Sequence, residues 1–404
     1  MKQPIILFIV LVFSVFAYGQ SNTYILAENY FRTSQYEKAA DLYKDLVSKS
    51  PYNTTYLQRL VTCYQELDNF NHAETLLLTL QKRKPELAFL NVILGYNYER
   101  QQQSDIANQH YTQAIVAIKK GSNYGSIIAN LFKSYNKLDL AIKAYETLLL
   151  KNKTSNFGFQ IAQIYGEKGE YVSMFEAYIN FVDQNDKFLS LVKRYTAKYI
   201  TDDSDNENNI LFRKALLRKA VRAPKNVWND LLSWLFIKQK QYDKALLQLK
   251  ALYARDANYL SEIKELGDVA YQEKAYNTAV LCFDFILNET TFPEEKFEAI
   301  YMKLLVSLAT NKPEMENDFQ AVFKTYGINK NTVNIQVAYA NYLTFQQNNP
   351  EKANIVLEEA LTHANTVYQQ ANIKLKLGDV LVYQNKFNKG LIYFSQVQTR
   401  LKNH

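Results

Sequence analysis

The 404-residue sequence is poor in the residues from which most enzyme sites are built. It has four histidines, His72, His110, His363 and His404, which lack the paired spacing of a metal site. Its 11 glycines form no phosphate-binding loop, and it contains no GxSxG motif. Carboxylates stand beside lysines, as in YEKAADLYKDL, where pairing in solvent at i, i+4 spacing accounts for them. These absences argue against an enzyme, and the sequence predicts neither a metal nor a cofactor.

Cysteine and net charge are also scarce. The two cysteines, Cys63 and Cys282, fall in distant parts of a repetitive chain, whereas a disulfide needs α-carbons within about 7 Å of each other. We therefore expect buried, unpaired thiols, with an intermolecular disulfide as the alternative. The 47 basic and 40 acidic residues give a formal net charge of +7, which is too small an excess to indicate a nucleic-acid partner.

Only the first residues form a long hydrophobic run. The stretch MKQPIILFIVLVFSVFAYGQ places Lys2 before the apolar residues 5–13 and has the small residues Ala17 and Gly19 after them. The run is shorter than the roughly 20 residues that span a bilayer. It predicts a signal peptide over residues 1–19, export to the periplasm or cell envelope, and no transmembrane anchor after cleavage. The Asn, Lys, Ile and Tyr content looks like that of a Bacteroidota protein.

A 34-residue period dominates the rest of the chain. Small residues recur at two phases: Ala27, Val61, Gly95 and Ala129, and then Ala39, Ala73, Ala107 and Ala141. Large residues follow the first series by three positions and the second by four, namely Tyr30, Tyr64, Tyr98 and Phe132, and Tyr43, Leu77, Tyr111 and Tyr145. These spacings place each pair on one helical face, so that small residues let two helices approach while rings fill the space beside them. Each unit is therefore predicted to be a helical hairpin.

This helix-turn-helix period resembles the tetratricopeptide repeat (TPR) family. The matching residues of the first unit are Leu26, Ala27, Tyr30, Ala39, Tyr43 and Pro51, and a fifth unit has Met174 where the family prefers alanine. The resemblance implies an all-α fold, an α-solenoid of stacked TPR-like hairpins wound into a right-handed superhelix.

The pattern restarts in the second half of the chain. Its markers are Ser233, Phe236, Ala245 and Leu249, then Gly267, Ala279 and Phe283, and finally Gly378, Phe387, Gly390 and Phe394. We therefore expect a TPR-like block of about five repeats over residues 20–186 and a second one over 226–404, with 294–365 divergent. Residues 187–225 are interpreted as a divergent helical connector with an acidic loop at 201–209. Many tyrosines and phenylalanines, Phe387 and Phe394 included, fall on core phases.

In proteins of this family the first helix of each hairpin lines a concave groove. By phase, the resemblance implies a partner-binding groove formed by Tyr24, Glu28, Phe31, Gln58, Thr62, Gln65, Val92, Tyr96, Glu99, Ser126, Asn130, Lys133, Phe159, Gln163, Asp230, Trp234, Ile237, Lys264, Asp268 and Tyr271. Aromatic and amide side chains suit a polypeptide. Phe89 and Ile93 stand where some relatives have groups that bind a terminal carboxylate, so that activity is not inferred. A solvated face without a ligand is the alternative.

A basic helical face is the last candidate site. Lys214, Arg218, Lys219, Arg222 and Lys225 share an arc that we place opposite Phe212, Leu216, Leu217, Ala220 and Val221. The arc is either solvated or binds an acidic partner.

The pattern as a whole favours a non-enzymatic scaffold in the bacterial cell envelope that binds other, unidentified proteins on its concave face. A self-assembling structural protein and an RNA-binding helical-repeat protein are the alternatives. Because the sequence ends near the second helix of a repeat, we also expect a C-terminal continuation or a partner to cover Leu391, Phe394 and Val397.

Overall fold

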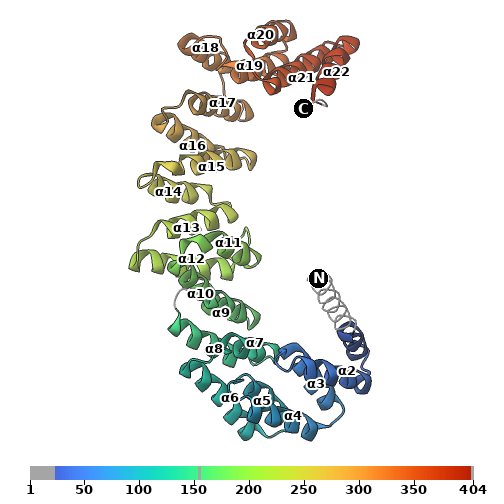
Figure 1. Cartoon of the computed structure of the whole chain (residues 1–404). Coiled ribbons are helices and arrows are strands. Elements are labelled where there is room, and N and C mark those ends of the chain that lie inside the picture. Colours follow the sequence, from blue (N-terminus) through green and yellow to red (C-terminus); the bar gives the residue numbers. More distant parts are fainter. Residues whose placement is uncertain (1–22, 153–155, 402–404) are drawn as a thin grey trace, which may run out of the picture. The chain divides into compact units, whose positions relative to one another are not determined.

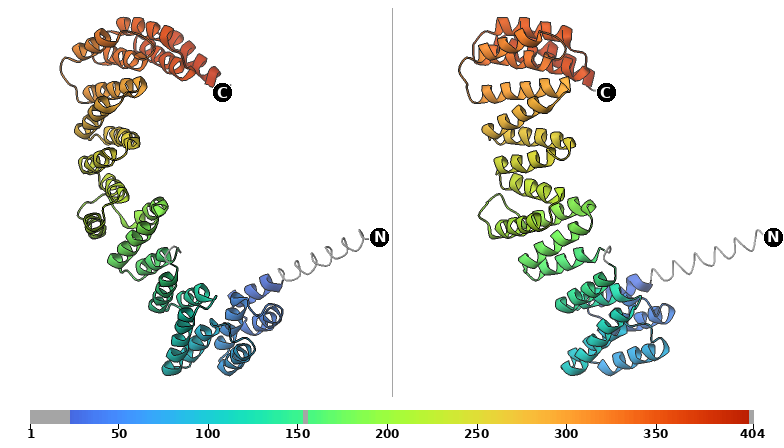
Figure 2. Two further views of the ribbon diagram at one scale, coloured as in Figure 1. Left: turned by 60° about the vertical axis from the view of Figure 1, so that its left-hand side comes forward. Right: turned by 90° about the vertical axis from the view of Figure 1, so that its left-hand side faces the viewer.

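The computed structural model describes residues 23–152 and 156–401, and every regular element in them is a helix. The chain divides into two compact units, with the division between Phe188 and Leu189. Within each unit, helices that are consecutive in sequence pack against one another (Figure 1 and Figure 2). The predicted all-α class is therefore confirmed. The predicted signal peptide lies outside the described residues, and among those described no helix has the length and apolarity needed to cross a membrane.

Unit 1 consists of successive helical hairpins. Helical residues 23–32 precede α2 (Tyr36–Lys49). The following helices are α3 (Thr54–Glu66), α4 (Phe70–Arg83), α5 (Leu90–Arg100), α6 (Ser104–Lys120), α7 (Gly125–Ser134), α8 (Leu138–Lys151), α9 (Phe157–Glu167), α10 (Tyr171–Gln184) and the short η1 (Asp186–Phe188).

Unit 2 begins less regularly and then continues as hairpins. Its elements are α11 (Leu189–Thr196), η2 (Ala197–Tyr199), α12 (Glu207–Arg222), α13 (Asn226–Lys238), α14 (Tyr242–Tyr253), η3 (Ala257–Tyr259), α15 (Leu260–Gln272), α16 (Tyr276–Glu289), α17 (Pro293–Ala309), α18 (Met315–Tyr326), α19 (Val333–Phe345), α20 (Pro350–His363), α21 (Val367–Tyr383) and α22 (Phe387–Leu401). Helices α17 to α20 form two hairpins within the stretch whose spacing is shifted in the sequence.

The small residues of the period lie at the closest approaches between helices. Ala27, Ala39 and Ala129 have no exposed surface, and the rings of Tyr43 and Phe132 are buried beside such positions. This burial confirms the core phase of the small residues, of Tyr43 and of Phe132, while Tyr30, Tyr64 and Tyr98 of the first-helix series are half-buried.

One predicted core residue is not in the core. Phe387 is 55% exposed, because it lies with Leu391 on a side of α22 that no described helix covers. Val397, which was expected to need a cover, is buried against the rest of unit 2.

Both cysteines are free and buried, one in each unit. Burial raises the pKa of the Cys63 and Cys282 thiols to about 12, so both remain protonated and unreactive at neutral pH. The prediction of unpaired thiols is confirmed.

Left-handed residues in the hairpin turns also follow the period. Ser34, Asp68, Gln102 and Asn136, each 34 residues after the last, have φ between 56° and 63°, and Gly169 takes the same place in the next turn with a φ of 76°. At the third turn, Gln102 N–H donates to the Glu99 carbonyl (2.8 Å) and Gln103 N–H to that of Tyr98 (2.9 Å). This pattern is a Schellman motif, which satisfies the last carbonyls of the first helix and ends it at a fixed residue.

We expect opposite effects from two substitutions at this turn position. Gln102→Gly should raise the free energy of unfolding by about 1 kcal/mol, because glycine adopts a left-handed φ without a Cβ penalty. Gly169→Ala should lower it by about the same amount, although an added Cβ would meet no atom within 4 Å. Urea unfolding of both variants measures the two changes, and changes of the same sign would contradict the proposed role of φ.

The acidic loop is shorter than predicted. It ends at Asn206, whose side chain caps α12 by accepting from Asn208 N–H (3.0 Å), so residues 207–209 are helical. The fully buried Asn209 binds the loop backbone through three hydrogen bonds. Its Nδ2 donates to the carbonyls of Thr201 (2.9 Å) and Asp203 (2.6 Å), and its Oδ1 accepts from Thr201 N–H (3.2 Å). The loop is therefore folded back onto α12.

Candidate binding face on the first helices of unit 1

A hollow of about 350 Å³ lies across the first helices of three consecutive hairpins, α3, α5 and α7. Its residues on α3 share one helical face, since they are spaced by three or four positions. The lining comprises Thr55, Gln58, Arg59, Thr62 and Gln65 from α3, Tyr96 and Arg100 from α5, and Ser134 and Tyr135 at the end of α7. Gln58, Thr62, Gln65 and Tyr96 belong to the groove predicted from the sequence.

Helices α3 and α7 approach each other across α5. Gln58 Nε2 donates a hydrogen bond to Ser134 Oγ at 3.0 Å, although 76 residues separate them. The Tyr96 and Tyr135 rings stack with centroids 4.1 Å apart, and burial raises the pKa of the Tyr135 phenol. Because neighbours surround α5, Val92 is fully buried, and its predicted place in the groove is wrong. The face is therefore a confined hollow.

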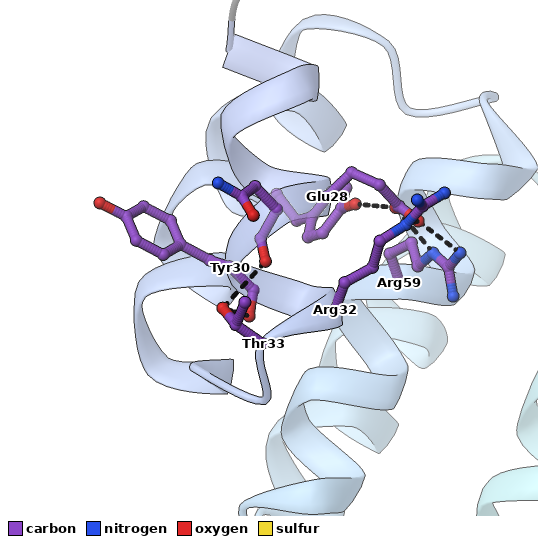
Figure 3. A network of polar contacts seen from close by, with 7 residues as sticks. Glu28, Tyr30, Arg32, Thr33 and Arg59 are labelled. Atoms are coloured by element: carbon purple, nitrogen blue, oxygen red, sulfur yellow. Dashed lines mark hydrogen bonds and ion pairs between the residues drawn. The ribbon is translucent and has the colours of Figure 1, made fainter.

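Two arginines contribute positive charge to the hollow, and each is paired at its rim. Arg59 binds Glu28 through two hydrogen bonds, Nε to Oε2 at 3.1 Å and Nη2 to Oε1 at 2.8 Å (Figure 3), and its guanidinium lies 4.2 Å from the centroid of the Phe31 ring. Arg100 Nη1 binds Glu66 at 3.2 Å. Because the charges are compensated, the lining is polar and close to neutral.

Glu28 connects three helices at this rim. Besides Arg59, it accepts hydrogen bonds from Tyr43 Oη (2.8 Å) and from Arg32 (3.3 Å), and its side chain is only 12% exposed. Burial alone would raise the pKa of Glu28, but the Tyr43 hydrogen bond and the Arg59 charge outweigh it, so the pKa lies below its ordinary value of 4.5.

This lowered pKa predicts an acid-dependent loss of stability. Because the Glu28 pKa is lower in the folded than in the unfolded protein, its contribution is fully present above about pH 4.5 and is lost as the pH falls through the folded-state pKa. Glu28→Gln should lower the free energy of unfolding of unit 1 at pH 7 and make that free energy less dependent on pH. Urea unfolding of both proteins between pH 3 and pH 7 measures this; a variant with an unchanged pH profile would contradict it.

Several other predicted groove residues bind neighbouring helices. Glu99 accepts from Tyr111 Oη (2.8 Å) and pairs with Lys137, and Asn130 accepts from Tyr145 Oη (2.5 Å). The ion pairs are Lys133 with Glu167 (2.7 Å), Asp230 with Lys193 (2.5 Å) and Lys264 with Glu298 (2.6 Å). The Gln65 amide is buried and donates to Asn97 at 3.1 Å. These side chains therefore stabilise the stack of hairpins.

The predicted aromatic groove residues are half-buried against other rings. The centroid distances are 5.4 Å for Tyr24–Tyr56, 5.7 Å for Phe31–Tyr36, 5.9 Å for Phe159–Tyr178, 6.5 Å for Trp234–Phe212 and 6.1 Å for Tyr271–Tyr276. Of the remaining positions, Ser126 is exposed, Gln163 and Ile237 are half-buried, and burial raises the pKa of Asp268. Truncating Phe31, Tyr96 or Trp234 is thus expected to lower stability as well as any binding.

Five residues that line the hollow were not predicted from the sequence, namely Thr55, Arg59, Arg100, Ser134 and Tyr135. The signal for the first two is the continuous i, i+3, i+4 face of α3, which extends beyond the three phases assigned by resemblance. Arg100 continues the same face of α5 one turn after Tyr96. Nothing local to α7 indicates that Ser134 meets α3.

The basic face of α12 is only partly as predicted. Phe212 and Leu216 are buried, but Leu217 is 46% and Val221 82% exposed. The buried stripe of α12 comprises Asn209, Phe212, Ala215 and Leu216, and this stripe points Leu217 and Val221 away from the core. Lys214, Arg218 and Arg222 are exposed, Lys225 is half-buried, and the half-buried Lys219 lies 5.9 Å from the Trp228 ring.

Fold and hollow together define a class, that of all-α proteins made of consecutive helical hairpins. No protein-family model and no curated protein matches the chain. Among solved structures it is similar to the P58(IPK) TPR domain (13% identity, 91% of this chain and 99% of that chain covered, TM-score 0.25). It is also similar to the APC/C hetero-tetramer Cut9–Hcn1 (10% identity, 95% of this chain and 88% of that chain covered, TM-score 0.31). A third similar structure is the C-terminal part of a TPR repeat-containing protein from Cytophaga hutchinsonii (15% identity, 72% of this chain and 98% of that chain covered, TM-score 0.26).

No group of His, Cys, Asp or Glu side chains in the part of the chain that the structure describes could hold a metal ion.

Proposed function

We propose that this protein is a non-enzymatic scaffold that binds polypeptide partners on the first-helix face, with the hollow between α3, α5 and α7 as a principal contact. The observation that carries the proposal is that three successive hairpins contribute to one polar, nearly neutral hollow. Its amide and hydroxyl groups both donate and accept hydrogen bonds, as a peptide backbone requires. The pairing of Arg59 with Glu28 and of Arg100 with Glu66 favours an uncharged polar segment over a phosphorylated one.

We further propose that the scaffold acts in the periplasm or cell envelope of a bacterium. This part depends on the sequence of residues 1–19, with Lys2, an apolar run and small residues before the expected cleavage site. Fractionation of cells that produce the chain with and without residues 2–19 tests it. Retention of the full chain in the cytoplasm would contradict export.

Site-specific photocrosslinking tests the binding face. A photoreactive phenylalanine analogue at Thr62, in the hollow, should crosslink a discrete envelope protein, whereas the same group at the exposed Thr79 on α4 should not. A second copy of this chain crosslinked at Thr62 would instead support self-assembly, and RNA would support the nucleic-acid alternative. The same adducts from both positions would overturn the proposed face.

A further inference from the structure

Unit 2 contains a second hollow, of about 430 Å³, that the proposed function does not use. It lies where α17 meets the beginnings of α19 and α21 and the loops before them. Phe297 on α17 lines it together with Asn331 and Asn365, which lie in loops and precede the first residues of α19 and α21 by two positions each. On α17, Phe297 and Tyr301 are one turn apart and lie on the same face.

The aromatic side chains form a half-buried platform. Phe297 packs edge-on against Tyr326, with centroids 5.3 Å apart, which fixes its ring. Tyr301 is half-buried one helical turn away. Two rings at this separation, about 5–6 Å between their Cβ atoms, offer apolar faces of the size of one or two saccharide rings.

Amide side chains with unused hydrogen-bonding groups surround this platform. Asn331, Asn334 and Asn365 are exposed, and none of their side-chain amides bonds to another residue in the ranges that the structure describes. Each amide offers two donors and an acceptor. Neighbouring hydroxyls on a sugar ring, which both donate and accept, are matched by such groups.

The charge of the hollow argues for an uncharged ligand. Glu294 and Lys330 have opposite signs, and Glu298 is already paired with Lys264 at 2.6 Å. No excess positive charge is available for a phosphate or an acidic polymer. A neutral polyhydroxylated ligand satisfies the amides without leaving a buried charge unpaired.

We propose that this hollow is a carbohydrate-binding site for neutral oligosaccharides. The C–H face of a sugar ring stacks on Phe297 and Tyr301, and its hydroxyls bind the amides of Asn331, Asn334 and Asn365. The three asparagines converge on one hollow from the beginnings of two helices, Asn331 and Asn334 from α19 and Asn365 from α21, an arrangement that suits a compact ring better than an extended peptide. The site is independent of the hollow in unit 1.

Binding of defined sugars to the full chain tests the site. Maltohexaose, cellohexaose, xylohexaose and chitohexaose at millimolar concentration are titrated by calorimetry, with saturation-transfer NMR as a second readout. At least one should bind, and Asn331→Ala combined with Asn334→Ala should weaken it about 10- to 30-fold, the loss of two hydrogen bonds, with an unchanged melting temperature. Asn277→Ala, an exposed asparagine on α16, is the matched control.

Phe297→Ala should also abolish sugar binding. If the Phe297→Ala protein does not fold, the double variant Asn331→Ala, Asn334→Ala still tests the site. Failure of all four sugars to bind overturns the proposal, as does binding that the double asparagine variant leaves unchanged. A neutral peptide that binds at this hollow in place of the sugars would overturn it too. None of these results bears on the Thr62 crosslink.

Discussion

Replacing Gly95 by leucine is expected to lower the free energy of unfolding of unit 1 by about 3 kcal/mol. Gly95 lies where α5 meets α6, and a Cβ built on it would be 2.4 Å from Tyr111 Cε1 and 3.1 Å from the Ala107 carbonyl oxygen. The ring cannot move aside easily, because it is buried and its hydroxyl donates to Glu99 at 2.8 Å. Ala39→Leu and Ala279→Leu should act in the same way, each costing about 1 to 3 kcal/mol.

Gly158→Ala on α9 is a control in which a buried helical glycine gains a Cβ without a clash. Gly158 is also buried in a helix, but a Cβ there would meet Phe181 at 3.4 Å, an ordinary van der Waals contact. Since alanine is favoured over glycine in a helix by about 1 kcal/mol, this change should stabilise the protein. Urea unfolding measures all these variants, and an equal loss of stability in Gly95→Leu and Gly158→Ala would contradict the assigned helix crossing.

The second large effect is expected at Asn209. Asn209→Ala should cost about 3 kcal/mol, because it removes three hydrogen bonds and leaves the carbonyls of Thr201 and Asp203 without this partner. The loop over residues 201–206 should then detach from α12 and become sensitive to proteases.

The neighbouring asparagine provides the control. Asn208 is half-buried, and only its backbone N–H takes part in the cap of α12. Asn208→Ala should therefore change stability by less than about 0.5 kcal/mol. Melting curves and limited proteolysis compare the two variants, and similar behaviour of both would show that Asn209 does not hold the loop.

The hairpins could be predicted because their cause is local. A small residue such as Ala39 or Gly95 is required wherever two helices approach closely. Because such residues recur every 34 positions, the sequence itself shows where the helices of each hairpin meet. The turns were harder to predict, since four of the five left-handed positions that follow the period in unit 1 hold serine, aspartate, glutamine or asparagine, and glycine stands at the fifth, Gly169. Residue identity there does not reveal the backbone conformation.

The hollow in unit 1 could be predicted only in part. Phase within the repeat identified Gln58 and Tyr96, because the exposed side of a helix follows from its own periodicity. The curvature that brings Ser134 to Gln58 depends on packing over three hairpins. The same packing buries Val92 on α5, which lies between the helices that carry these two residues. No single repeat contains that information.

The hydrogen bond between Gln58 and Ser134 has a consequence for how unit 1 unfolds. In an array whose hairpins touch only their immediate neighbours, stability is a sum of nearest-neighbour couplings, and an end can fray one hairpin at a time. The hydrogen bond from α3 to α7 adds a coupling that bypasses the third hairpin, α5 and α6, so the hairpins on either side of it cannot separate unless this bond also breaks. Helices α3 to α8 should therefore behave as one cooperative segment whose amide hydrogens exchange together, while α9 and α10, which lie outside this loop and are coupled to it through α8, should exchange faster.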